Sequence, residues 1–312
     1  MRPLPFRRLF LLAATLATSS FAAWQDDFTS LDTRRWLIQL YTFPANGCNM
    51  RAANLRISDS ILDIHVTKAT DTTDRKWDGG DLGDQQYRTY GLFRTRAKPS
   101  ALKGSVSAFY IMNKWVATNW EHKEIDIEFL GMNLTKIQLT THDFQDGGTV
   151  WKNDSKTVDL GFDFSQDFHE YAILWRPDTV FWFADGKLLH RTGKYVPQVG
   201  LETRMNFYVG NPDEPGVLQW LGPIDTAGIP AVTRFDWVRF DPLDSLPDPY
   251  RAWALPTGIR NRRPLAATTP GSWFDSRGRR RSRGTEHTTR GCSVLHGQIP
   301  SKDAAASILV LP

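Results

Sequence analysis

Residues 124–129 read Glu-Ile-Asp-Ile-Glu-Phe, so that an acidic residue alternates with a large apolar residue for six positions. Successive side chains of a β-strand point to opposite faces, and the pattern therefore predicts a strand whose apolar residues enter the core while three carboxylates line the other face. A solvated face of a structural strand is the alternative, but such a face would more naturally mix Lys, Thr and Glu. Three acids this close repel one another, which favours a catalytic role for Glu124, Asp126 and Glu128.

The spacing of these acids suits cleavage of a glycosidic bond. Double displacement needs two carboxyl groups in different protonation states, about 5–5.5 Å apart. The Cα atoms of Glu124 and Glu128 are four residues apart, or roughly 13 Å at a rise of about 3.3 Å per residue, so their side chains must lean towards each other, as on a concave sheet. Asp126 can hold the neighbouring acid protonated through its charge and hydrogen bonding, which raises that pKa towards working pH.

The surrounding sequence predicts an all-β domain. From Trp24 to about Pro242, short alternating segments are broken by Gly, Pro, Asn and Asp, and no convincing amphipathic helix occurs. Asp185-Gly186 predicts a tight hairpin, because both residues accept positive φ. We expect strands at residues 61–66, 105–111, 136–142, 171–175, 180–183 and 235–240.

The N-terminus predicts an export signal over residues 1–22. Arginines precede an apolar run from Leu9 to Thr18, and residues 20–22 offer a small-x-small triplet for signal peptidase. A membrane anchor is the alternative, but the run is shorter than the roughly 20 residues that a bilayer needs. We therefore expect a secreted protein, extracellular or periplasmic, without membrane attachment after cleavage.

The net charge of +4 is unevenly distributed. Residues 251–312 hold 11 Lys and Arg against 3 Asp and Glu, which leaves 27 against 31 in residues 1–250. The mildly acidic body gives no reason to expect a nucleic acid partner. We place a catalytic domain at residues 23–245 and a basic tail at residues 246–312, whose low periodicity predicts disorder. The tail is either a tether to an anionic surface or a dispensable extension.

A family resemblance is carried by residues 124–131, Glu-Ile-Asp-Ile-Glu-Phe-Leu-Gly. They resemble the signature of glycoside hydrolase family 16, in the uninterrupted Glu-x-Asp-x-Glu form of lichenases and xyloglucan endotransglucosylase/hydrolases, and the similarity extends from about Trp24 to Phe240. The resemblance implies a curved antiparallel β-sandwich, a concanavalin A-like jelly roll, with a substrate cleft on its concave face. It also implies that Glu124 is the nucleophile, Asp126 the assisting residue, and Glu128 the general acid and then base of a retaining mechanism.

The same resemblance implies substrate-binding residues on other strands. Gln138 matches a family position that contacts the sugar near the nucleophile. Met205-Asn206-Phe-Tyr208 resembles the family segment Met-Asn-Leu-Trp, which makes Asn206 and Tyr208 candidate binding residues, although Tyr offers a smaller stacking face than Trp. Gly79-Gly-Asp81 resembles a Gly-Glu segment that supplies a carboxylate to the substrate.

Three further substrate-binding candidates have structural alternatives. Trp120 lies four residues before Glu124, and it either stands at the rim of the cleft or packs in the core. His142, on the same predicted strand face as Gln138, binds substrate or makes a structural hydrogen bond. Trp220 is expected on the loop after the Asn206 strand, as a stacking residue or as a packing residue.

No cofactor is expected for catalysis. Asp236 matches a strand that contributes to a structural calcium site in many relatives, although Ca²⁺ takes six to eight oxygen ligands and one Asp is weak support. Cys48 matches the first half of a lichenase disulfide, but Gly79 stands at the second position, so the sequence predicts no bridge between them.

The sequence therefore favours a secreted endo-β-glucanase that acts as a monomer on a polysaccharide, above all on 1,3-1,4-β-glucan. One alternative is a transglycosylase that passes the sugar to a hydroxyl acceptor on xyloglucan or another β-glucan. A second is a lectin-like module that binds glucan without cleaving it, but such modules lose the acids. Thr140 and Tyr208 differ from lichenases at positions that set linkage preference, so the polymer stays open.

Overall fold

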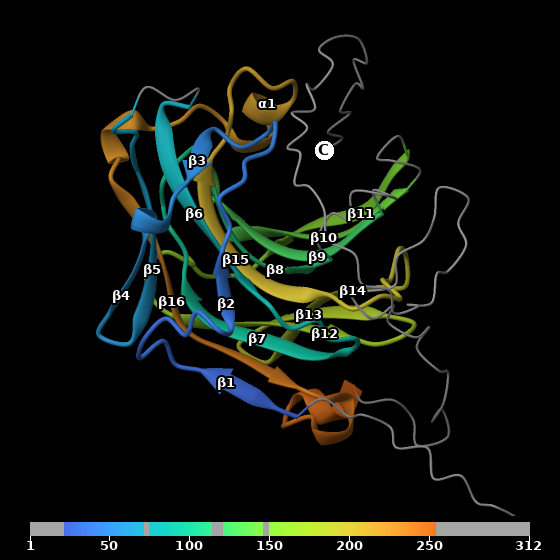
Figure 1. The fold of residues 1–312 in the computed structure, drawn as a ribbon. Helices are drawn as coiled ribbons and strands as arrows, with labels where there is room; N and C mark the ends of the chain where they lie inside the picture. The colour runs from blue at the N-terminus through green and yellow to red at the C-terminus, as the bar shows by residue number, and fades with distance from the viewer. Residues whose placement is uncertain (1–21, 72–74, 114–120, 146–149, 254–312) are drawn as a thin grey trace, which may run out of the picture.

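The computed structural model describes residues 22–71, 75–113, 121–145 and 150–253, which form a curved β-sandwich with very little helix (Figure 1). The strands follow one hydrogen-bonded path that folds over on itself. The first six strands of this path are here called the inner half and the last six the outer half. The inner half contains, in spatial order, β11 (Val150–Asp159), β10 (Lys136–Gln145), β9 (His122–Leu130), β8 (Ser105–Met112), β15 (Glu202–Val209) and β6 (Trp77–Asp84). The outer half contains β5 (Ile61–Lys68), β16 (Ala231–Asp241), β7 (Gly91–Lys98), β12 (His169–Trp175), β13 (Val180–Ala184) and β14 (Lys187–Thr192).

Four short strands lie beside this path. They are β1 (Trp24–Asp26) on β16, β2 (Trp36–Ile38) and β3 (Cys48–Met50) on β6, and β4 (Leu55–Ser58) on β5. The helical segments are α1 (Val217–Leu221) and the 3₁₀ turns η1 (Ala52–Asn54), η3 (Thr226–Gly228), η4 (Leu243–Ser245) and η5 (Tyr250–Trp253). The all-β class and all six predicted strand regions are confirmed.

The two halves of the path pack face to face through a large apolar core. Phe129 of β9 and Tyr171 of β12 meet edge to face, with ring centroids 4.6 Å apart. Both isoleucines of the segment 124–129 are fully buried in the same core, which confirms the inward side of the predicted alternation. Trp182 of β13 is also buried, and its indole N–H donates to the backbone carbonyl of Asp126 at 2.9 Å. The outer half is thereby bonded directly to the strand that carries the acids.

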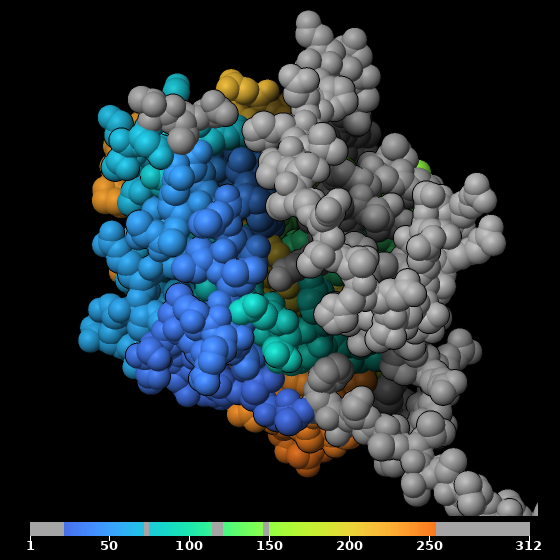
Figure 2. All heavy atoms as spheres, viewed as in Figure 1, coloured from blue at the N-terminus to red at the C-terminus, as the bar shows by residue number. Residues whose placement is uncertain are grey.

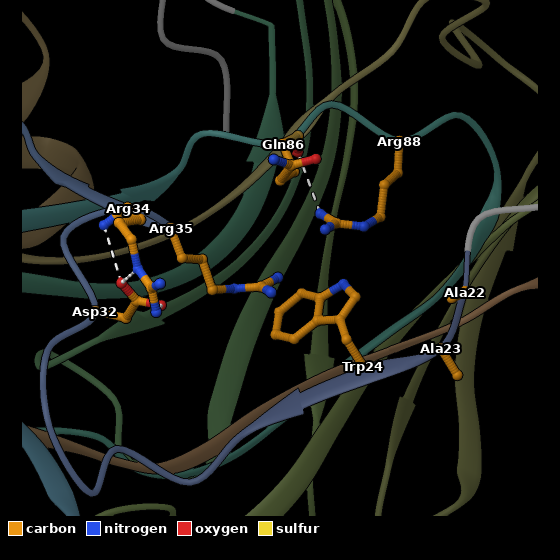
Figure 3. A pocket seen from close by; sticks show the side chains of 8 residues that line it. All are labelled: Ala22, Ala23, Trp24, Asp32, Arg34, Arg35, Gln86 and Arg88. Carbon is orange, nitrogen blue, oxygen red and sulfur yellow. Dashed lines mark hydrogen bonds and ion pairs between the residues drawn. The ribbon is translucent and has the colours of Figure 1, made fainter.

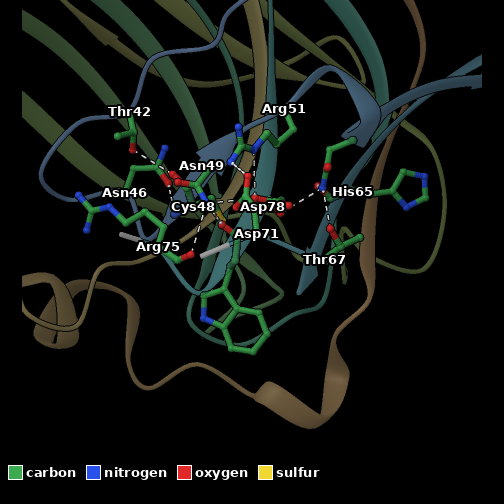
Figure 4. Close-up of polar contacts among 12 residues, drawn as sticks. Thr42, Asn46, Cys48, Asn49, Arg51, His65, Thr67, Asp71, Arg75 and Asp78 are labelled. Carbon is green, nitrogen blue, oxygen red and sulfur yellow. Dashed lines mark hydrogen bonds and ion pairs between the residues drawn. The ribbon is translucent and has the colours of Figure 1, made fainter. Parts of the chain in front are cut away.

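A polar network around Asp78 of β6 holds the corner where the two halves join (Figure 4). The Asn49 side-chain amide donates to the Asp78 carboxylate at 3.1 Å, and the Asn54 amide donates to the backbone carbonyls of His65 at 3.0 Å and Asp78 at 3.1 Å. β5 and β6 pair over only two residue pairs, so few ladder hydrogen bonds are available. The side-chain amides therefore bond backbone carbonyl groups that the short ladder leaves without a partner.

Cys48 of β3 lies in this corner as a buried thiol and forms no disulfide within the described part of the chain. A side chain placed on Gly79 would meet Cys48 Cβ at 3.1 Å, so Gly79 does stand where a partner cysteine would be. Burial raises the pKa of the Cys48 thiol to about 12, which keeps it protonated.

The predicted hairpin is also confirmed. Asp185 and Gly186 join β13 to β14 with φ of 47° and 73°, the left-handed conformation that a two-residue hairpin turn requires.

In the space-filling view the N-terminal strands form a continuous surface on one side of the molecule (Figure 2). No helix in the described ranges is long and apolar enough to cross a membrane.

The folded region continues past the domain boundary predicted at residue 245. Leu246 and Tyr250 are buried, and the Tyr250 ring packs edge to face on Phe183 of β13 at 5.0 Å. These apolar side chains cover the outward face of β12 and β13, which would otherwise be exposed to water. Residues 246–253 therefore belong to the folded domain, and the remainder of the predicted tail lies outside the described residues.

Candidate active site

The three predicted acids lie in a row on one face of β9. This strand pairs with β8 and β10 in unbroken antiparallel register, so the unbulged form of the motif is confirmed. On β10 the facing residues are His142 opposite Glu124, Thr140 opposite Asp126 and Gln138 opposite Glu128. Directly opposed residues of antiparallel strands share a face, so β10 brings polar side chains to the acids.

Glu124 is held by a histidine that the sequence analysis did not single out. His122, two residues earlier on the same strand face, has its Nε2 2.5 Å from Glu124 Oε2. Burial opposes ionisation of Glu124, but the charge of His122 and its hydrogen bond lower the pKa of Glu124 to about 2. A hydrogen bond from Asp126 acts in the same direction. Glu124 is therefore ionised at neutral pH.

Asp126 is the most deeply placed of the three acids, at 3% exposed. Burial and the neighbouring charge of Glu124 raise the pKa of Asp126 well above its ordinary value. His142 Nε2 lies 3.0 Å from Asp126 Oδ2, but this contact lacks hydrogen-bond geometry, and Oδ2 has no hydrogen-bond partner among the described residues. These effects favour a proton on Asp126, which hydrogen-bonds to Glu124.

Glu128 is protonated for a different reason. Burial first, and then the charges of Asp126 and Glu124, raise the pKa of Glu128 to about 8. Gln138 Nε2 donates to Glu128 Oε2 at 3.1 Å, and the indole N–H of Trp220 donates to Gln138 Oε1 at 3.2 Å. Trp220 thereby fixes which end of the Gln138 amide faces Glu128.

These contacts correct two expectations. Gln138 lies beside Glu128 rather than near the proposed nucleophile, because the register of β9 and β10 pairs these two residues. Trp220 lies in the short helix α1 rather than on a loop, and its N–H is already bonded to Gln138. At neutral pH the row holds Glu124 ionised and Glu128 protonated. It can therefore supply both a nucleophile and a general acid.

The β10 and β11 side of the row carries Gln138, His142, Phe144 and Trp151, here called the neutral flank. Trp151 donates its indole N–H to His142 Nδ1 at 3.1 Å and stacks on Phe144 with ring centroids 4.8 Å apart. Burial lowers the pKa of His142, and because Nδ1 accepts, the ring proton lies on Nε2, which faces Asp126. Both His142 nitrogens thus face protein groups, which favours its structural alternative.

The β8, β15 and β6 side carries Asp81, Tyr110, Glu202 and Arg204, here called the ionic flank. Arg204 is buried, and it donates to Glu202 Oε1 at 2.6 Å and to Tyr41 Oη at 2.7 Å. Tyr110 Oη donates to Asp81 Oδ2 at 2.8 Å, and Arg204 Nη1 lies 3.6 Å from the same oxygen. Burial raises the pKa of Asp81 to about 6, although Arg204 and Tyr110 oppose this. Asp81 is thus part of a buried network rather than an open carboxylate.

Asn206 and Tyr208 of β15 share the face of the ionic flank, and both are almost fully buried. Asn206 Oδ1 is buried and has no hydrogen-bond partner in the described ranges. Tyr208 packs edge to face against Phe43 with ring centroids 5.3 Å apart and is 4% exposed. The open stacking face expected at Tyr208 is therefore not present. Trp120 lies outside the described residues.

Asp236 of β16 is the carboxylate expected at a calcium site. It forms an ion pair with Arg96 of β7, so a guanidinium already neutralises it. Among the residues that the structure describes, no group of three or more His, Cys, Asp and Glu side chains could hold a metal ion. The residues present at Asp236 do not fit a calcium ion, and no functional step is assigned to one.

A hollow lined by Trp24, Arg35 and Arg88 lies beside β1, away from the acids (Figure 3). Both arginines of the hollow have an acidic partner: Arg35 and Arg88 donate to Asp84, at 2.9 and 2.6 Å. The Arg35 guanidinium also lies over the Trp24 ring, 3.3 Å from its centroid. These contacts explain the hollow as a structural junction between the N-terminal segment and β6.

Sequence reasoning missed His122, Tyr110, Arg204 and Trp151. His122 stands at the same period of two as the three acids, so extending the alternation by one step would have included it. Tyr110 and Arg204 become visible only when the order β9, β8, β15 is known, because they belong to strands distant in sequence. Trp151 carried no motif, and only its pairing with Phe144 brings it to the site.

Comparison with known proteins gives a consistent picture. Residues 46–218 match the family model described as glycosyl hydrolases family 16. A β-glucanase of Brevibacillus brevis is 32% identical over 230 residues, covering 72% of this chain and 83% of the relative. A β-glucanase of Bacillus subtilis (strain 168) is 32% identical over 240 residues, covering 75% of this chain and 93% of the relative.

Solved structures agree with these relatives. A prokaryotic β-1,3-1,4-glucanase (lichenase) derived from a mouse hindgut metagenome superposes with a TM-score of 0.64 at 29% identity, covering 71% of this chain and all of that one. A κ-carrageenase from Pseudoalteromonas carrageenovora superposes with a TM-score of 0.58 at 14% identity, covering 74% of this chain and 98% of that one. At that identity the second match shows the shared fold alone.

Proposed function

Because the chain belongs to glycosyl hydrolase family 16 and is an endo-acting β-glucanase, we propose that it cleaves 1,3-1,4-β-glucan with retention of anomeric configuration, through Glu124, Asp126 and Glu128. One observation carries the roles of the two glutamates: they lie four residues apart on one strand face and have pKa values of about 2 and about 8, while retention itself is proposed from the family motif. An ionised nucleophile and a protonated acid are thereby present together at neutral pH.

The reaction follows from this charge pattern. Glu124 attacks the anomeric carbon while Glu128 gives its proton to the leaving glycosidic oxygen, and a covalent glycosyl-enzyme forms. Glu128, now ionised, then takes a proton from water as the water attacks the same carbon and releases Glu124. Asp126 shares its proton with Glu124 and so stabilises the carboxylate before attack and after release.

Polymer preference rests on the relatives, since the β-glucanase names and the lichenase structure come from proteins about 30% identical to this one. One feature of the neutral flank bears on the sugar. Trp151, which is bonded to His142, is 39% exposed, as a stacking face for a sugar ring requires. Transfer to a sugar hydroxyl in place of water is the second candidate, favoured by the same acids.

The substitution Glu124→Gln tests the nucleophile. We expect hydrolysis of barley glucan to fall on the order of 10³-fold or more, because the amide cannot form the covalent intermediate. The exposed Glu121→Gln, three residues earlier, is the matched control and keeps wild-type activity. Reducing-sugar release on a panel of barley glucan, laminarin, xyloglucan and agarose measures both variants. Full activity of Glu124→Gln would remove this mechanism.

Stereochemistry and acceptor choice need separate measurements. Proton NMR during the first turnovers should show the β-anomer of the product, and an α-anomer would contradict retention. Product analysis with added oligosaccharide acceptor separates hydrolysis from transfer.

Secretion and a monomeric state are also proposed. The predicted signal at residues 1–22 supports export, and N-terminal sequencing of protein recovered outside the cytoplasm checks its cleavage. Light scattering in solution checks the monomer.

A further inference from the structure

His122 has no part in the reaction as written above, yet it is hydrogen-bonded to the proposed nucleophile. It is 3% exposed, and its Nε2 lies 2.5 Å from Glu124 Oε2. A buried side chain bonded to a reacting carboxylate restricts where that carboxylate can point. We propose that His122 is a positioning residue for Glu124, holding Oε2 so that Oε1 is the oxygen that attacks the anomeric carbon. This inference rests on the proposed function.

The imidazole of His122 is itself held in place by the neutral flank. Its ring meets Phe144 edge to face with centroids 5.1 Å apart. Phe144 in turn stacks on Trp151, and Trp151 donates to His142. The contacts therefore connect β9, β10 and β11, and they fix the donor that faces Glu124.

The other groups around Glu124 do not replace His122. Asp126 on β9 shares its proton with Glu124, and His142 on β10 lies opposite it. Asp81 and Tyr110 of the ionic flank interact electrostatically with Glu124, and so do Tyr41 and Tyr208. Lys123 points to the other side and pairs with Asp143. Of the basic side chains in this set, His122 is the one with a hydrogen bond to Glu124.

This contact has a use in both steps of the reaction. When Oε1 bonds to the anomeric carbon, Oε2 becomes the carbonyl oxygen of the glycosyl ester and still accepts from His122. When water attacks, the departing carboxylate regains its negative charge, and the same donor stabilises it. His122 thus affects the rate of the chemical steps more than the binding of the polymer.

Two substitutions separate positioning from a packing role. His122→Gln keeps an amide N–H at nearly the reach of Nε2 but removes the charge, whereas His122→Leu removes both. His65→Gln, on β5 of the outer half, is the control histidine, because no described contact links it to the acids.

The experiment measures kcat, KM and the pH dependence of kcat/KM on the glucan of the panel that the wild type cleaves best. His122→Leu should lower kcat by about 10- to 100-fold, the value of one hydrogen bond to a charged group, with KM changed less than about twofold. The acidic limb of its kcat/KM profile should move to higher pH, towards the ordinary glutamate pKa of 4.5, because Glu124 loses the partner that favours its charged form. His122→Gln should regain part of kcat while its acidic limb stays raised.

Wild-type kcat and an unmoved acidic limb in His122→Leu would overturn the inference, as would a change in KM alone. If His122→Leu fails to fold, an unmoved acidic limb in His122→Gln overturns it by itself. If the wild-type enzyme cleaves no β-glucan of the panel, the proposed function itself is wrong, and this inference is overturned with it.

Discussion

The two flanks of β9 are built from opposite chemistry around the same three acids. The ionic flank contains a buried arginine with carboxylates and phenols, all bonded to one another. The neutral flank contains an amide, an imidazole and two aromatic rings, and its members bond or lie directly beside the acids. Arg204 lies two strands away from β9, whereas Gln138 lies on the adjacent strand.

This difference separates two tasks. A buried charged network contributes mainly through the penalty of breaking it, so the ionic flank should determine whether the sheet folds. Neutral donors beside the acids change which protonation state is favoured, so the neutral flank should determine the pH range of activity. Substitutions on each flank test this separation.

The largest effect is expected from Arg204→Leu on the ionic flank. This change leaves the buried carboxylates of Glu202 and Asp81 without the guanidinium, which costs on the order of 3–5 kcal/mol in unfolding free energy. Urea unfolding measures it. Arg34→Leu is the control, since Arg34 is paired with Asp32 on the surface, and its urea midpoint should stay close to that of the wild type. Equal stability of the two variants would remove the distinction between the flanks.

An intermediate effect is expected from Gln138→Leu on the neutral flank. Glu128 must be protonated to act as acid, so wild-type kcat/KM should be lost as pH rises through about 8. Gln138 donates to the charged form and lowers that pKa, so its loss should move the alkaline limb up by about one pH unit, for a hydrogen bond on the order of 1.4 kcal/mol. A limb that stays or moves down contradicts this assignment.

The smallest effect is expected from Trp220→Phe, which keeps the aromatic ring and removes only the N–H bonded to Gln138. The Gln138 amide then loses its preferred orientation, and the alkaline limb should move up by less than in Gln138→Leu. Adding Trp220→Phe to Gln138→Leu should cause no further movement, because the indole acts through the amide. If Trp220 instead stacks on the sugar, KM rises and the limb does not move.

Sequence periodicity was sufficient for the all-β class and for the row of acids, whereas the curved sandwich was expected from the family resemblance. An alternation of acid and apolar residues places the apolar side chains on one face of a strand and the acids on the other, and the hairpin at Asp185-Gly186 follows from local backbone preference alone. Both are properties of neighbours in sequence. The domain end was placed too early because the burial of Tyr250 depends on the outer sheet, which the local composition does not reveal.

The flanks could not be predicted in the same way. Arg204 of β15 pairs with Gly83 of β6, and the absence of a side chain at Gly83 leaves room for the guanidinium. A Cβ atom added at Gly83 would lie 3.4 Å from Arg204 Nε and 2.9 Å from Gln39 Nε2. That compatibility joins residues more than a hundred positions apart. The pairing of Gln138 with Glu128 likewise depends on a register that the motif does not contain.

The bond from Trp182 to the Asp126 carbonyl has a practical consequence for anyone who engineers this enzyme. Because this hydrogen bond joins the catalytic strand to the layer behind it, repacking the outer half for heat resistance would shift the backbone that carries the acids. Libraries aimed at thermostability should therefore hold Trp182 fixed, and libraries aimed at altered pH range gain a site remote from the substrate.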